Sequence, residues 1–135
     1  MKRTVSLITL YGLGHFYIDF ICAFVLAFIA FSSIPSLPEI GFLVLLYNII
    51  AFGAQPFFGY FIDVHYIPRW GASAGLVLGT FGLIFFFKPL LATILLGLGN
   101  ALYHVGGGII ALNMVPGKAK FPGMYVAPGA IGLFF

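Results

Sequence analysis

The chain has 135 residues, of which 62% are hydrophobic and only 7% are charged, and its mean hydropathy is +1.16. Because a soluble domain carries about 25% charged residues, this composition excludes a chain whose surface faces water throughout and predicts an integral membrane protein. The net charge of +3 rests on so few residues that it does not indicate a nucleic-acid partner. The single cysteine, Cys22, excludes an internal disulfide framework.

Five apolar segments follow one another along the chain and are interpreted as membrane spans of about 20 residues each. Their approximate limits are 5–31, 40–62, 70–87, 90–114 and 123–135. The last segment would reach only about 20 Å as a helix, against a hydrocarbon core of about 30 Å. We therefore expect one all-α transmembrane domain over residues 1–135, with four full spans and a truncated fifth, as the N-terminal piece of a longer protein.

The breaks between these segments carry prolines and charges. Ser32–Glu39 contains two prolines, and in Lys88-Pro89 the proline suits the first turn of the next helix. If the spans alternate in direction, five of the six Lys and Arg residues fall on one side of the membrane: Lys2, Arg3, Arg69, Lys118 and Lys120. Lys88 falls on the other side with Glu39. This excess of basic residues predicts a cytoplasmic N-terminus, in a plasma or inner membrane.

The first segment carries Tyr11, His15 and Asp19, which are each four residues apart and so share a helical face. An aspartate near the middle of a span costs about 3 kcal/mol on insertion scales and normally faces a protein interior or a water-filled path. Histidine titrates near neutral pH. The pair predicts a proton-coupling or substrate site; alternatively, Asp19 only locks helices together by pairing with His15 or the backbone.

The second segment carries Asn48 and Gln55, which are seven residues apart and share a face. Such amides either hold helices together or bind a polar solute, and Pro56 permits a local bend. Asp63 lies just after this segment, where it is placed to pair with Arg69 or with a neighbouring helix terminus. With Gly59, this pair suggests a cytoplasmic gate; the alternative is an ordinary charged turn.

The third and fourth segments combine glycines with buried polar groups. Asn100 and His104 share a face of the fourth segment, and Tyr103 lies beside them. Together they suggest a cavity lined by polar side chains, although a buried histidine is often a packing residue. In the third segment, small residues at spacings of four predict a groove for close helix packing: Gly71, Gly75 and Gly79.

Three stretches of the chain resemble the major facilitator superfamily, and within it the fosmidomycin-resistance-type exporters. His15-Phe-Tyr-Ile-Asp19 is similar to an H-x-x-x-D on their first helix, and Gln55-Pro56-Phe-Phe-Gly59-Tyr60-Phe-Ile-Asp63 to their Q-P-x-x-G-Y-x-x-D. The stretch from Gly97 to His104 is similar to their fourth-helix G-x-G-x-x-x-x-H. The order and spacing of the three stretches agree with the family.

The sequence also departs from the superfamily pattern at three places. Val64 stands where a basic residue usually follows the loop aspartate, and the arginine of many drug/proton antiporters is absent from the fourth segment. Pro128-Gly129 and Gly132 are similar to the end of the G-P-x-x-G antiporter motif, but Ala127 stands where its first glycine would be. In place of the missing arginine, His104 is the candidate for proton coupling.

The resemblance implies twelve helices in two halves, so this chain would be a partial N-terminal half that needs the C-terminal half as its partner. It implies proton-coupled export of a small molecule or drug, without a cofactor, a metal or enzymatic activity. Asp19, with His15 or His104, would exchange a proton, and Gly59, Asp63 and Arg69 would form the gate. Polar side chains from three spans would line the solute path: Tyr11, Asn48, Gln55, Asn100 and Tyr103.

Two other functions stay open at this point. Within transport, the alternative is uptake of a sugar or an organic acid. From another class, the chain would be a complete small membrane protein that binds a partner or self-associates through its third-segment glycines. An enzyme is disfavoured, because neither a metal cluster nor a nucleophile–base set is visible in the sequence.

Overall fold

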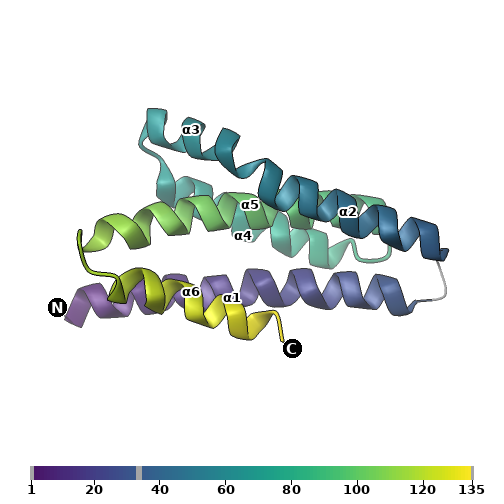
Figure 1. Ribbon diagram of the computed structural model, residues 1–135, viewed down its shortest axis with the longest axis horizontal. Helices are drawn as coiled ribbons and strands as arrows, with labels where there is room; N and C mark the ends of the chain where they lie inside the picture. Colours follow the sequence, from purple (N-terminus) through teal and green to yellow (C-terminus); the bar gives the residue numbers. More distant parts are fainter. Residues whose placement is uncertain (1, 33–34, 135) are drawn as a thin grey trace.

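The computed structural model describes residues 2–32 and 35–134 of the chain. Helices take up 87% of the described residues, which contain no strand, so the all-helical prediction is confirmed there. The elements are α1 (Lys2–Phe31), α2 (Leu37–Gly53), α3 (Gln55–His65), α4 (Pro68–Ile84), α5 (Pro89–Met114) and α6 (Lys120–Gly132). They lie roughly along one long axis (Figure 1), as expected for helices that bury apolar stripes against one another.

Three helical runs are long and apolar enough to cross a membrane: α1, the run Leu37–His65 formed by α2 and α3, and α5. This is consistent with an integral membrane protein. Helix α4 has 17 residues and α6 has 13, and neither meets the same length requirement. The expected count of four full spans and a truncated fifth therefore stays a prediction.

Several boundaries differ from those expected. The loop expected at Ser32–Glu39 ends earlier, because Ser36 donates its backbone N–H and its hydroxyl to the Glu39 carboxylate (2.6 and 2.7 Å) and α2 begins at Leu37. Residues 33 and 34 of that loop, and the terminal residues 1 and 135, lie outside the described residues. Helix α5 begins at Pro89, as the tight break after Lys88 predicts.

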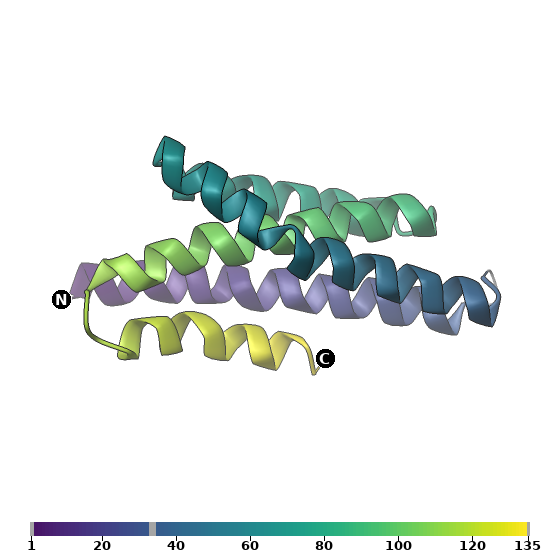
Figure 2. The same ribbon diagram turned by 45° about the horizontal axis from the view of Figure 1, so that its top comes forward.

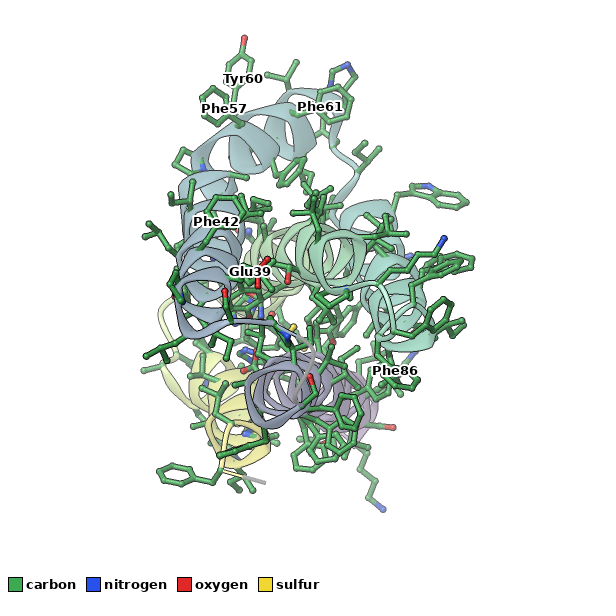
Figure 3. All side chains as sticks on the ribbon, turned by 90° about the vertical axis from the view of Figure 1, so that its right-hand side faces the viewer. Glu39, Phe42, Phe57, Tyr60, Phe61 and Phe86 are labelled. Carbon is green, nitrogen blue, oxygen red and sulfur yellow. The ribbon has the colours of Figure 1, made fainter. Side chains whose placement is uncertain are left out.

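The run Leu37–His65 is broken in the middle. Helix α2 ends at Gly53 and α3 begins at Gln55, with Ala54 between them. Pro56 has no N–H to donate to the preceding turn, so the helical ladder is interrupted at the predicted bend. Beyond this break α3 diverges from the rest of the bundle (Figures 1 and 2), and Phe57, Tyr60 and Phe61 point away from it (Figure 3). This outward apolar face suits lipid.

Helix α5 is the centre of the bundle and contacts all five other helices. Its backbone touches that of α4 at glycines: a Cβ on Gly99 would lie 2.5 Å from Gly79 N, and one on Gly106 would lie 2.5 Å from Ala72 N. Helix α6 lies alongside α1 (Figures 1 and 2). Small residues thus let α5 approach its neighbours closely enough for polar side chains on different helices to meet.

The helix ends sort the basic residues. The N-terminus, the α3–α4 turn and the α5–α6 connection lie at one end of the bundle, and the α4–α5 connection lies at the other (Figure 1). The first three segments contain five of the six Lys and Arg residues, and Lys88 is in the last. The charges are therefore segregated as the alternating spans require, while the side of the membrane that each end faces stays a prediction.

Candidate functional site

Helices α1 and α5 bring two imidazoles and one carboxylate together. His15 and Asp19 lie one turn apart on α1, and His104 reaches them from α5. The Nε2 atoms of His15 and His104 lie 2.8 Å apart. Asp19 Oδ2 lies 3.3 Å from His15 Nε2, and Asp19 Oδ1 lies 3.6 Å from His104 Nε2. His15 and Asp19 are each only 4% exposed. We call these three residues the cluster.

Backbone carbonyls determine which ring nitrogens of the cluster carry hydrogen. His15 Nδ1 lies 2.9 Å from the carbonyl oxygen of Tyr125, and His104 Nδ1 lies 2.9 Å from that of Asn100. A carbonyl oxygen only accepts hydrogen bonds, so we assign an N–H to both Nδ1 atoms. In the neutral rings both Nε2 atoms then present lone pairs to each other and to the Asp19 carboxylate. This arrangement is repulsive unless a cation lies between them.

Neighbouring side chains hold the cluster in place. Asn100 donates from Nδ2 to Asp19 Oδ1 (3.2 Å) and lies 3.9 Å from Cys22 Sγ. The ring of Tyr125, on α6, stacks on the ring of His15 with centroids 4.5 Å apart. Gly129, also on α6, makes room for both α1 residues, because a Cβ there would lie 2.6 Å from His15 Cδ2 and 2.7 Å from Asp19 Oδ2. The cluster is thus a built site rather than a chance contact.

A cavity of about 450 Å³ opens beside the cluster, between α1, α3, α5 and α6. His15, Asp19, His104 and Gln55 are its polar lining, and Tyr125 borders it. The remaining lining is apolar or glycine: Gly108, Ala111, Leu112, Pro122, Val126, Ala130 and Leu133. An apolar cavity with a few convergent polar groups is typical of a small-molecule site.

Tyr11 and Tyr103, expected on the solute path with Asp19, border a different cavity. This cavity has a volume of about 590 Å³ and lies between α1, α4 and α5. Its lining also includes the hydroxyl-bearing residues Tyr17, Ser73 and Thr80. The Tyr103 hydroxyl donates to the Tyr11 carbonyl at 2.5 Å. Tyr11 is separated from Asp19 by eight residues, which rotates it about 80° around the helix. A spacing of four residues therefore places His15 beside Asp19, whereas Tyr11, eight residues from Asp19, borders the other cavity.

The two amides expected to share a face are also separated. Asn48 is exposed on α2, donates to the Val44 carbonyl (2.7 Å) and borders neither cavity. Gln55 donates to the Ala51 carbonyl (2.9 Å) and lines the cluster cavity. The break at Ala54 explains the difference, because the two residues belong to different helices and the periodic argument does not run through the turn.

The residues expected to form a gate lie at the end of the bundle that also holds the N-terminus. Asp63 and Arg69 line a cavity of about 770 Å³ there, but both are exposed and no ion pair joins them in the described part of the chain. A Cβ on Gly59 would meet only Val105 Cγ1, at 3.8 Å. These three residues therefore share a region without forming a closed clasp.

The glycines expected to pack helices lie on the buried face of α4. A Cβ on Gly75 would lie 2.5 Å from the backbone N of Tyr103, and one on Gly71 would lie 2.5 Å from Ile62 Cδ1. Gly79 faces the side chain of Ile18. Thus α4 meets α5, α3 and α1 through the same small-residue stripe.

Sequence reasoning missed two residues of the site, Tyr125 and Gly129, both on α6. Gly129 lies in the stretch that is similar to the antiporter motif, and this weak likeness was its only signal. Tyr125 had no signal in the sequence, because it contributes only its backbone carbonyl and the face of its ring to the site. Sequence reasoning grouped Asp19 with His15 or His104 for proton exchange, but it did not predict that one potential ligand atom from each of the three lies within 4.8 Å of the others.

The structure is a helical bundle with three helical runs long and apolar enough to cross a membrane, and it holds a site of two imidazoles and one carboxylate. Comparison of the chain with protein-family models, with curated proteins and with solved structures finds no match.

Proposed function

We propose that this chain is the N-terminal part of a proton-coupled secondary transporter that exports a small molecule. The observation that carries the proposal is the pair of Nε2 atoms, 2.8 Å apart beside the Asp19 carboxylate. One proton placed between these atoms converts a repulsive contact into a charge-assisted hydrogen bond, with Asp19 as its counter-ion.

Loss of that proton would favour a different arrangement of the helices. The unprotonated cluster holds two facing lone pairs and a carboxylate in a site of low dielectric, where repulsion is strong. The protonated cluster draws α1 and α5 together, and α6 follows through the bond from His15 to the Tyr125 carbonyl. A proton therefore stabilises one state over the other, which is the differential stability that coupling requires.

Few other groups near the cluster carry charge. Four further titratable side chains interact with Asp19, and all four are neutral in their ordinary form: Cys22, Tyr47, Tyr103 and Tyr125. Within the described residues, no Lys or Arg lines the cluster cavity. A mobile cation, rather than a fixed one, therefore balances Asp19.

The cluster cavity is the proposed solute site, with Gln55 as an uncharged polar group in its lining, and Asn100 would act on the path from behind Asp19, to which it donates. Tyr11 and Tyr103 would join the path from the neighbouring cavity, and Asn48 would join it from the exposed side of α2 in another state. Gly59, Asp63 and Arg69 would close the basic end, which we propose faces the cytoplasm. In this proposal α4 and α6 complete four spans and a partial fifth, and the C-terminal half of a major facilitator superfamily protein is the partner.

The test is Asp19→Asn in the protein expressed from its full open reading frame and reconstituted in vesicles, with fosmidomycin as the probe solute. We expect accumulation driven by a pH gradient to be lost, because an amide cannot act as the counter-ion, while the melting curve changes little. Glu39→Gln is the matched control, since it removes a carboxylate far from the cluster. Full gradient-driven transport by Asp19→Asn would contradict the proposal, and loading of right-side-out rather than inverted vesicles would indicate uptake.

A further inference from the structure

We infer that the cluster also binds a divalent transition-metal ion of the kind that imidazole favours, with Zn²⁺ as its representative. The inference goes beyond the proposed function, because metal binding would hold whether or not the protein couples transport to protons. It rests on the donor atoms, their spacing and their supporting hydrogen bonds.

The donor set is the first argument. His15, Asp19 and His104 each offer one ligand atom, and these atoms lie within 4.8 Å of one another. Two imidazoles with one carboxylate are a donor set used for zinc, and the same combination holds ferrous iron in other proteins. Both Nε2 atoms are free of hydrogen in the neutral rings, because both Nδ1 atoms donate to carbonyls. Both rings are therefore in the tautomer that leaves Nε2 available to bind a metal ion.

The spacing is the second argument. For metal–nitrogen bonds of about 2.0–2.1 Å in a tetrahedron, neighbouring ligand atoms are about 3.3 Å apart. The two nitrogen–oxygen distances, 3.3 and 3.6 Å, lie close to this value. Only the separation of 2.8 Å between the nitrogens is short. A shift of about 0.5 Å by His104 would supply the remaining room, and this ring is 24% exposed toward the cavity, whereas His15 is held by Tyr125.

The supporting hydrogen bonds are the third argument. Histidines that bind metals usually donate their second ring N–H to a carbonyl or carboxylate, and carboxylate ligands are hydrogen-bonded in turn. Here Tyr125 and Asn100 supply the two carbonyls, and Asn100 Nδ2 donates to Asp19. All three ligands are thus oriented before any ion arrives. The cavity of about 450 Å³ leaves the fourth coordination position open to water or a solute.

His65 provides a matched comparison within the same chain. Its Nδ1 lies 2.8 Å from the carbonyl of Phe61, one turn earlier, as His104 Nδ1 lies by Asn100. It is exposed on α3 and belongs to no group of potential ligands in the described residues. A metal that binds only through any available histidine would bind His65 as readily as the cluster.

The experiment is a calorimetric titration of the full protein in lipid nanodiscs with Zn²⁺, supported by the visible absorption spectrum with Co²⁺. We expect one ion per chain and a Co²⁺ spectrum of a four-coordinate site with nitrogen and oxygen ligands. His104→Gln and Asp19→Asn should each weaken Zn²⁺ binding by more than tenfold, and His65→Gln should leave it unchanged. His104→Gln is the safer variant for folding, because its ring lies at the rim of the cavity.

Absence of Zn²⁺ binding, or equal binding by the unaltered protein and His104→Gln, would overturn the inference. Equal losses for His104→Gln and His65→Gln would also overturn it, because they would indicate adventitious binding by histidines. Failure here is distinguishable from failure of the proposed function. Gradient-driven transport without Zn²⁺ binding would remove only the metal site, and Zn²⁺ binding without gradient-driven transport would remove only the coupling.

Discussion

Helix α1 borders two cavities, one toward α6 and one toward α4, and their polar side chains differ in how they are paired. Toward α4, three of the hydroxyl groups have neutral partners: Tyr17 and Thr80 lie 3.0 Å apart, and the Tyr103 hydroxyl donates to the Tyr11 carbonyl. Toward α6, the cluster combines a carboxylate with two imidazoles whose lone pairs face each other. The facing lone pairs of the second cavity favour a proton or another cation between them, and the hydrogen-bonded hydroxyl groups of the first do not.

This difference separates two meanings of a polar residue in a membrane helix. A neutral hydroxyl that finds a partner contributes to packing and is consistent with a structural role. A buried carboxylate without a fixed cation depends on an ion that comes and goes. Of the two cavities, only the one beside α6 therefore has a reason to respond to protons or metals.

Among the stability effects that distinguish the two cavities, the largest is expected from a substitution at Gly129. In Gly129→Ala the new methyl group would lie within 2.6 and 2.7 Å of His15 and Asp19, so either α6 or the cluster must move. We expect a loss of about 1–3 kcal/mol in the free energy of unfolding, measured by thermal or denaturant unfolding in detergent.

Gly123 gives the control on the same helix. A Cβ there would meet nothing within 4 Å, so Gly123→Ala should be neutral or slightly stabilising through helix propensity. Equal stability for the two variants would mean that α6 does not press on the cluster as described.

A smaller effect is expected in the hydroxyl cavity. Tyr17→Phe removes one partner of the pair with Thr80, which keeps its own bond to the Leu76 carbonyl (2.8 Å). We expect a loss of about 0.5–1.5 kcal/mol in stability, while fosmidomycin transport stays coupled to the pH gradient. A loss of coupling in this variant would show that both cavities share the proton and would contradict a proton site confined to the cluster.

Local chemistry made most of the fold predictable. Continuous apolar runs predicted the helices, and the prolines at 56 and 89 marked a break and a helix start where the structure has them. The charge pattern predicted which connections share an end. The predicted limits agree closely for α5 but differ by up to three residues for the other helices, because the apolar signal alone does not show where a capping turn closes.

The cluster was only partly predictable. The spacing of four put His15 beside Asp19, but a tertiary crossing brings His104 to them, and no periodicity encodes which helices cross. Other causes separated the remaining residues: the eight-residue spacing turns Tyr11 away from Asp19 on α1, and the break at Ala54 puts Asn48 and Gln55 on different helices. Gly129 and the Tyr125 carbonyl escaped notice because a glycine and a backbone group contribute space and geometry rather than a distinctive side chain.

The most direct test of the central claim, that one cation is shared between His15 and His104, is nitrogen NMR of the chelator-treated protein labelled with ¹⁵N-histidine. We predict protonated Nδ1 atoms on both residues and a scalar coupling between their Nε2 atoms across a shared proton, with His65 showing no such coupling. Asp19→Asn should weaken or abolish the coupling. Two independent rings with hydrogen on Nε2, and no coupling between them, would contradict the account.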